Sequence, residues 1–333
     1  MGQFWMLLNV SNLWVSGGGA KLGEFFCSEG LPVHIRRFTI PAWSEESKTS
    51  LCVKYPQITH RSASPESKLF CLPDELLLMI FNYVNILADA ACLCLADGRM
   101  FAVGFPRVIE LQAAAYANWA GCCVVCIGEY AEDNDLPKYV QKLFEHHRKM
   151  LCEEDTNPPD EQAVWYDTYN RHFQRVTSGG LTGHHFPRGL EMMETEPSKG
   201  FGQLWAPYTE MMKPKYESPH PWVLCNLSKG EYVRVDAVAA LTNYNGHKPF
   251  IAGDIDLGHA LLSQICWSTD DSIAMGYEGD LHRGRWAGDR FVVLPMNKLD
   301  TRKTWQDVSD EVTKILVKIW ECEWGEDWKE LIG

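Results

Sequence analysis

The sequence contains no apolar run long enough to cross a membrane and no excess of positive charge. Within its 333 residues, every apolar stretch is shorter than the roughly 18–20 residues that a membrane span needs. Lys and Arg number 31 against 44 Asp and Glu, a net charge of −13, whereas a general nucleic-acid binder carries a basic face and anionic membranes attract basic segments. The apolar N-terminus lacks the basic start and the cleavage site of a signal peptide. The sequence therefore predicts an intracellular protein, cytoplasmic or nuclear, without a nucleic-acid or membrane partner.

The common catalytic and metal-binding motifs are also missing. There is no Gly-x-Ser-x-Gly elbow, no His-Glu-x-x-His and no dinucleotide fingerprint. The chain has 12 Cys, but only Cys123 and Cys126 form a Cys-x-x-Cys pair. Neither of the two His-His pairs, at 146–147 and 184–185, completes a recognisable zinc spacing. Thiols of an intracellular chain are mostly buried and behave as small hydrophobes, so we expect no cofactor and no metal.

The most informative stretch that is present runs from Leu72 to Phe101. Pro73 can open a helix, because the first helical turn has no use for the missing N–H, and acidic residues at 74 and 75 suit the helix dipole. Apolar residues then recur at the spacing of one helical face, and a second apolar set follows Asp89. The two sets are Leu76, Leu77, Ile80, Phe81 and Val84, then Ala91, Leu93, Leu95, Met100 and Phe101. This pattern predicts two short helices packed on each other.

The Leu72–Phe101 stretch resembles an F-box. That family begins Leu-Pro-x-Glu-Leu-Leu and continues with an Asp, a Leu-x-Leu run, a basic residue and an aromatic. The corresponding residues here are Leu72-Pro73, Glu75-Leu76-Leu77, Asp89, Leu93-x-Leu95, Arg99 and Phe101. Gly98 and Ala90 depart from the pattern, since the family usually has Cys and Leu there. The resemblance implies docking to a Skp-type adaptor inside a cullin ubiquitin ligase. We expect Leu72, Pro73, Leu76 and Ile80 to carry this contact as apolar anchors.

The chain also repeats its beginning. The segment from Trp5 to Ser11 matches the segment from Trp222 to Ser228 at Trp, Leu, Asn and Ser, and Trp119-Ala-Gly matches Trp286-Ala-Gly. Both Trp-Ala-Gly segments lead into a strand, a turn and a helix. Four elements in the same order favour a duplication over chance matches in a Trp-rich chain. In the second copy, one clear helix over residues 257–267 occupies the interval that holds Leu72–Phe101 in the first.

Both copies resemble a module of small uncharacterised proteins. Those proteins begin Met-Gly-Gln-Tyr/Phe and later carry Gly-x-Trp-Ala-Gly-Asp-Arg, and fungal relatives combine both with an F-box-like centre. The first copy keeps the opening at residues 1–5, and the second keeps the later motif at residues 284–290. We therefore expect an α+β protein with two related modules of short strands and packed helices. The predicted parts are a first module over 1–155 with the F-box-like helices 72–103 inserted, a linker with a short helix over 156–220, and a second module over 221–333.

The richest polar cluster lies in the second copy, at His282, Arg283, Asp289 and Arg290. A carboxylate could orient His282 as a general base, and the arginines could hold a phosphate or carboxylate. The alternative is that Asp289 and Arg290 pair across a turn. The first copy has Cys122 and Cys123 at those two positions, so the fold of the module does not need the pair.

Three functions remain open at this point. The preferred one is a non-enzymatic interaction protein that recruits a ubiquitin-ligase adaptor and holds an unknown protein substrate. The second is a scaffold or binding protein of unknown role, whose F-box-like helices only form core. The third is a small-molecule enzyme that uses His282, Asp289 and Arg290. Exposure of Leu76 and Ile80 separates the first two, and convergence of His282 with Asp289 or Arg290 in one site is what the third requires.

Overall fold

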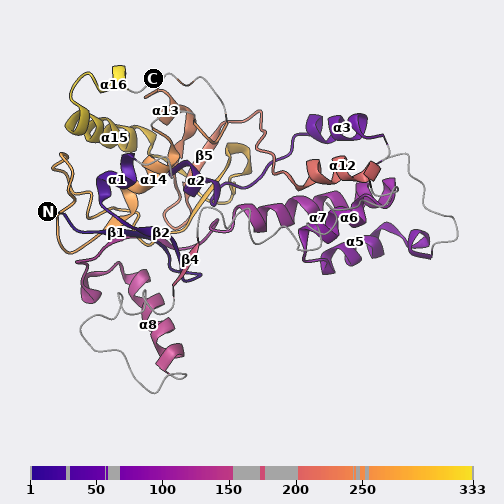
Figure 1. The fold of residues 1–333 in the computed structure, drawn as a ribbon, viewed down its shortest axis with the longest axis horizontal. Coiled ribbons are helices and arrows are strands. Elements are labelled where there is room, and N and C mark those ends of the chain that lie inside the picture. Colours follow the sequence, from indigo (N-terminus) through magenta and orange to yellow (C-terminus); the bar gives the residue numbers. More distant parts are fainter. Residues whose placement is uncertain are drawn as a thin grey trace. The chain divides into compact units, whose positions relative to one another are not determined.

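The protein folds as two compact units (Figure 1). The structure is a computed structural model, and it describes residues 2–27, 31–56, 58, 68–152, 173–176, 202–242, 244, 248–251 and 255–331. The larger unit comprises Met1–Thr39, Trp119–Gly179 and His220–Gly333, and the smaller comprises Ile40–Asn118 and Gly180–Pro219. Residues 40–118, which include the predicted F-box-like insertion at 72–103, belong to the smaller unit, and both predicted modules, 1–155 and 221–333, contribute to the larger one. Most of the predicted 156–220 linker lies outside the described residues.

The larger unit contains two sheets, with strand orders β4-β2-β1-β3-β7 and β8-β5-β6-β9. The strands are β1 (Trp5–Asn9), β2 (Trp14–Ala20), β3 (Val124–Gly128), β4 (Gln174–Val176), β5 (Trp222–Asn226), β6 (Glu231–Arg234), β7 (Cys266–Trp267), β8 (Phe291–Pro295) and β9 (Gln306–Asp307). The helices are α1 (Leu22–Cys27), α2 (Leu31–Arg36), α8 (Lys138–Cys152), α13 (Val235–Ala239), α14 (Leu257–Ile265), α15 (Ser309–Trp324) and α16 (Trp328–Leu331), with 3-10 turns η2 (Asp133–Asp135) and η3 (Met296–Lys298). The predicted α+β class is confirmed.

The central strands of the two sheets are covered on both faces. Every residue of β1, β3 and β5 is buried. A strand buried on both faces needs apolar side chains at successive positions, which explains their nearly continuous apolar sequences. Helix α14 is likewise buried along its whole length and packs against α2, α13 and α15. The core of the larger unit is therefore formed by the buried central strands of the two sheets and by helix α14.

The two sheets repeat the same pattern of pairing. In each, a hairpin strand and the strand after a Trp-Ala-Gly segment flank the central strand, and a fourth strand lies parallel to the hairpin's second strand. The first sheet places β4 after helix α8, whereas the second places β9 before helix α15. These shared pairings support the predicted duplication, which stays a prediction.

Equivalent hydrogen bonds also recur in the two copies. The Ser11 hydroxyl accepts from the backbone N–H of Cys123 at 2.9 Å, and the Ser228 hydroxyl accepts from the backbone N–H of Arg290 at 3.1 Å. Gly121 and Gly288, the glycines of the two Trp-Ala-Gly segments, have positive φ values of 77° and 79°. The N–H of Gly121 bonds the carbonyl of Phe291, and that of Gly288 bonds the carbonyl of Val124. The two turns thus exchange reciprocal backbone bonds with the strands of the opposite copy.

The N-terminal segment is fixed to residues far along the chain by Gln3, which is fully buried. Its Nε2 donates to the carbonyl of Asp270 at 2.9 Å, and its Oε1 accepts from the Ser268 hydroxyl at 2.8 Å and the Tyr130 N–H at 3.1 Å. Because a buried amide without partners would cost free energy, these bonds explain how a polar residue is tolerated there. The start of the chain is therefore part of the core of the larger unit.

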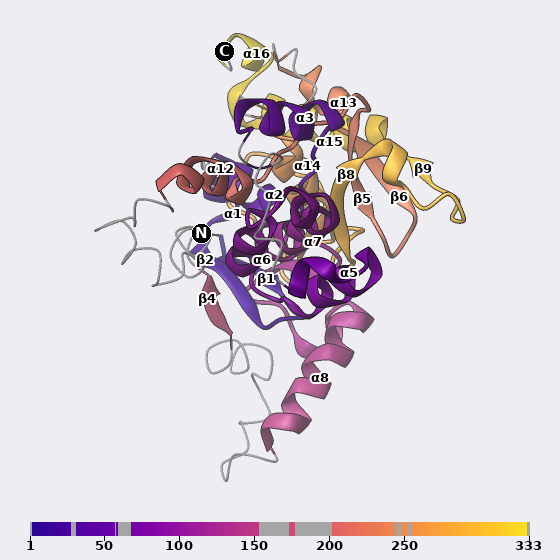
Figure 2. The same cartoon turned by 90° about the vertical axis from the view of Figure 1, so that its right-hand side faces the viewer.

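The described core of the smaller unit is built from helices. They are α3 (Glu45–Lys54), α5 (Asp74–Tyr83), α6 (Leu87–Cys94), α7 (Gly98–Tyr116) and α12 (Gly202–Met212), with the 3-10 turn η1 (Lys68–Cys71). Helices α5, α6 and α7 lie side by side, and α12 contacts α6 (Figures 1 and 2). The buried Gln112 connects distant parts, since its Oε1 accepts from the Trp43 indole at 2.8 Å and its Nε2 donates to the carbonyl of Met211 at 2.6 Å.

Helix α7 is longer than the sequence pattern indicates. It begins at Gly98 and continues through Pro106 to Tyr116, so Met100 and Phe101, predicted to lie on the second of two helices, belong to a third. Proline inside a helix leaves the carbonyl four residues earlier without its N–H partner. That residue, Ala102, is exposed, so water can reach its carbonyl. The prolonged α7 forms the platform on which α5 and α6 pack.

Candidate functional site

Helix α5 presents an apolar stripe outward while burying a second apolar face. Leu77 and Phe81 are fully buried in the core of the smaller unit. By contrast, Leu76 is 43% exposed, Met79 is 52% exposed and Tyr83 is 80% exposed. Residues three, four and seven positions apart share one face of a helix, so these three and the half-buried Ile80 form one stripe. We call Leu76, Met79, Ile80 and Tyr83 the docking stripe.

The four residues expected to bind the adaptor are placed differently by the structure. Leu76 and Pro73 are exposed, and Leu72 and Ile80 are half-buried against the core of the smaller unit. Met79 and Tyr83 were missed by the sequence reasoning, although their spacing from Leu76 is the signal that could have found them. Leu76 therefore does not belong to the core, which is the result that the adaptor hypothesis requires and the scaffold hypothesis does not.

The two ends of α5 contact arginines of α7. Arg99 donates from Nε to the Asp74 carboxylate and from Nη2 to the carbonyl of Leu72, both at 2.7 Å. Arg107 donates from Nε to the carbonyl of Val84 at 3.2 Å. The basic residue of the F-box-like pattern, Arg99, thus lies at the start of α5.

The polar cluster predicted in the second copy does not come together as one site. Arg283 pairs with Asp135 at 2.6 Å, and the backbone carbonyl of His282 accepts from the N–H of Ser268 at 2.9 Å. Asp289 instead accepts from the Asn226 amide at 2.8 Å, and Arg290 is exposed. Among the described interactions, His282 shares no contact with Asp289 or Arg290. The enzyme hypothesis therefore lacks the convergence that it requires.

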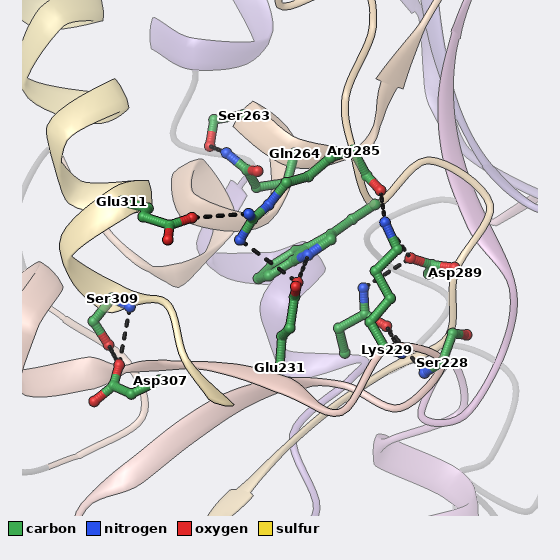
Figure 3. Close-up of polar contacts among 12 residues, drawn as sticks. Ser228, Lys229, Glu231, Ser263, Gln264, Arg285, Asp289, Asp307, Ser309 and Glu311 are labelled. Carbon is green, nitrogen blue, oxygen red and sulfur yellow. Dashed lines mark hydrogen bonds and ion pairs between the residues drawn. The ribbon is translucent and has the colours of Figure 1, made fainter. Parts of the chain in front are cut away.

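Asp289 belongs to a different network around the second Trp-Ala-Gly turn (Figure 3). Its carboxylate lies 3.9 Å from the ammonium of Lys229, which donates to the carbonyl of Arg285. Burial raises the pKa of Asp289, while the Asn226 hydrogen bond and Lys229 act in the opposite direction. The first copy has Cys122 at this position, so the network is an addition to the second turn and not a requirement of the module.

Arg285 and Glu231 complete this network (Figure 3). Arg285 pairs with Glu311 at 2.9 Å and with Glu231 at 3.5 Å, and Glu231 accepts from the indole N–H of the buried Trp286. Each charged side chain of this network has an opposite charge or a hydrogen-bond donor nearby. The arrangement satisfies buried and half-buried polar groups and fixes the turn to β6 and α15.

A buried polar group unrecognised from the sequence lies in the larger unit. The Ser16 hydroxyl on β2 lies 2.6 Å from His34 Nδ1 on α2. Asp256, the N-cap of α14, accepts from the N–H groups of Gly258 and His259. Ser16 is 2% exposed and Asp256 is 1% exposed, whereas His34 is half-buried. No short motif marks them, because they come from three separate elements.

His34 makes the stability of the protein depend on pH. The pKa of His34 is lowered to about 4, chiefly by burial and also by the positive charge of Arg37, while Asp256 acts in the opposite direction. The unfolded chain takes up this proton near pH 6.5, so the stability contribution is complete above that pH and is lost as pH falls toward 4. For this group alone we expect a loss of about 2 kcal/mol between pH 7.5 and pH 5.

Urea unfolding at both pH values checks this prediction, with His34→Asn as the comparison. Asn can keep a polar atom near Ser16 but does not titrate. The wild type should lose about 2 kcal/mol more than the variant over the same pH interval. Equal losses in the two proteins would show that His34 is not the group responsible.

The described residues contain neither a helix that is long and apolar enough to span a membrane nor a group of three His, Cys, Asp or Glu side chains able to hold a metal ion. Cys123 and Cys126 are both fully buried, and burial raises the pKa of Cys123 well above its ordinary value. Residues three apart in extended backbone point to opposite faces, so this pair is not arranged to chelate one ion.

Comparison with known proteins gives no further guide to the function. The chain matches no protein-family model, no curated protein and no solved structure.

Proposed function

We propose that this chain is an intracellular interaction protein that docks a Skp-type adaptor of a cullin ubiquitin ligase through helix α5. The observation that carries the proposal is the docking stripe, in which Leu76, Met79 and Tyr83 are exposed on one face. An amphipathic helix whose outer face is also apolar is suited to the groove of a partner protein. The F-box-like sequence of Leu72–Phe101 supplies the identity of that partner.

The magnitude of the apolar contact supports a specific interaction. Removing Leu, Met or Tyr side chains from water contributes roughly 1–3 kcal/mol each when burial is complete. Leu76, Met79 and Tyr83 are each more than two-fifths exposed, so much of this free energy is still available to a partner. Association has its own entropy cost, and a preformed helix keeps that cost low.

The scaffold alternative, in which the F-box-like helices only form core, accounts for part of α5. Leu77 and Phe81 do serve the core of the smaller unit. That role does not require apolar residues at the outer positions, where charged residues would serve equally well. We infer that the apolar side chains at the outer positions of α5 serve to bind a partner. The larger unit would then hold the protein substrate, and its two copies would derive from the proposed duplication.

The direct test is the binding of the purified full-length chain to a purified Skp-type adaptor. Isothermal titration calorimetry should give a Kd near or below about 1 μM, with the negative heat-capacity change of apolar burial. Size-exclusion chromatography of the chain alone identifies self-association through the same stripe. No binding to the adaptor at 100 μM of each protein would refute the proposal.

A further inference from the structure

We propose that Arg99 and Arg107 of helix α7 are positioning residues that hold helix α5 at both ends in its docking geometry. The inference rests on the proposed function, because it takes α5 as the docking element. The two arginines are eight positions apart, which is about 12 Å along a helix, and the 10 residues of α5 (Asp74–Tyr83) span about 15 Å. Their separation therefore suits the length of the helix that they contact.

At the N-terminal end of α5, Arg99 binds the residues on both sides of Pro73. One arm of its guanidinium bonds the Asp74 carboxylate and another bonds the carbonyl of Leu72, each at 2.7 Å. The backbone of Arg99 is itself fixed, because its N–H donates to the N-cap Asp97 at 2.8 Å. A planar guanidinium can hold two acceptors in a set geometry, which a lysine ammonium does less well.

At the C-terminal end, Arg107 binds the residues that terminate α5. Its Nε donates to the carbonyl of the C-cap residue Val84 at 3.2 Å, and its Nη2 donates to the Asn85 side chain at 3.1 Å. A cation near the last carbonyls of a helix also interacts favourably with the helix dipole. The side chain of Arg107 is 19% exposed, so solvent screens these contacts only in part.

A third contact, at a position of α7 between Arg99 and Arg107, fixes the middle of α5. A Cβ at Gly104 of α7 would lie 2.0 Å from the ring of Phe81, so the ring lies directly on the α7 backbone. Helix α5 is thus held at its start, centre and end by one helix. A partner that binds the docking stripe meets a helix whose orientation is already set, and it need not supply the free energy to order it.

The experiment uses the full chain with Arg99→Ala, Arg107→Ala, the double variant, and Arg99→Lys and Arg107→Lys. Two quantities are measured: amide hydrogen exchange over residues 72–85 in the free protein, and the Kd for the purified adaptor. We expect faster exchange in each Ala variant, a Kd raised about 5–10-fold by each and about 30-fold by both, and intermediate effects for Lys. Glu110→Ala is the matched control. It removes the 2.9 Å pair with Arg107 but leaves the contacts to α5, so exchange and Kd should stay within about twofold.

The two readouts separate the possible failures. If the wild-type chain does not bind the adaptor, the proposed function fails, and hydrogen exchange alone decides whether the arginines position α5. Unchanged exchange in the double variant overturns the inference, and so does faster exchange with an unchanged Kd. If the double variant loses its helical circular dichroism, hydrogen exchange and Kd of the two Lys variants decide instead whether the arginines position α5.

Discussion

Leu76→Asp should weaken adaptor binding at least about 100-fold while leaving the fold intact. Leu76 is 43% exposed in the free protein, so the carboxylate remains hydrated there. It would also stand in the first turn of α5, where the helix dipole favours negative charge. In the complex the same carboxylate would enter an apolar groove, and burying an unpaired charge is far costlier than losing a leucine contact. Calorimetric titration with the adaptor gives the affinity, and thermal unfolding should show Tm within about 2 °C of wild type.

Leu78→Asp is a closely matched control for this prediction. Leu78 lies on the same helix and is 45% exposed, yet its position two residues on points it away from the docking stripe. Its substitution should change the Kd by less than about threefold, because a side chain on the opposite side of α5 stays outside the contact. Equal losses from both variants would mean that the whole surface of α5 matters, or that the charge acts at long range. Weak effects from both would exclude the docking stripe as the contact.

Gly104→Leu should destabilise the smaller unit by about 3 kcal/mol, the upper end of the usual cost of overpacking a core. An added Cβ would lie 2.0 Å from the ring of Phe81, which is fully buried, so the ring or the helix must shift. Replacing a helical glycine otherwise gains about 1 kcal/mol, so any loss measures the steric conflict. The conflict would force α5 off α7. Circular dichroism melting should show a fall in Tm on the order of 10 °C or more.

Ala114→Leu on the same helix separates this steric conflict from the mere addition of an apolar side chain. Ala114 is exposed, so the new leucine projects into solvent, and Tm should change by less than about 2 °C. If Gly104→Leu were as stable as Ala114→Leu, the close approach of α5 and α7 would not exist as described. The same result would remove the central support from the positioning of α5.

Helix α5 could be predicted from local features of the sequence. Pro73, the acidic first turn and the apolar spacing are local features, and they predict a helix where α5 is found. The helix has two apolar faces, however, and periodicity alone cannot tell which one meets the core. Leu77 turned inward and Leu76 outward, although both are leucines in the same motif. That choice depends on packing against α7, which a local pattern does not contain.

The separate smaller unit could not be recognised from the chain order. Its helix α12 (Gly202–Met212) packs with α6, more than a hundred residues earlier, so the unit is completed only in three dimensions. The same limit applies to the polar cluster of the second copy. His282 and Asp289 are close in sequence, but a turn directs them to different partners. Conversely, Ser16 and His34 lie 2.6 Å apart without any shared motif.

The anchoring of Gln3 has a consequence for synthesis on the ribosome. The residue bonds Ser268 and Asp270, so Gln3 finds these partners only after residue 270 has been made. Residues 40–118 and 180–219 emerge earlier and can complete the smaller unit first. During that interval β1 can pair with β2 and β3, but β7 (Cys266–Trp267), which pairs with β3, has not yet been made, and a late long-range pairing of this kind favours aggregation and slow folding. Chains that end before residue 266 should therefore be bound by chaperones more strongly than the full chain, because the edge of β3 that pairs with β7 stays open in them.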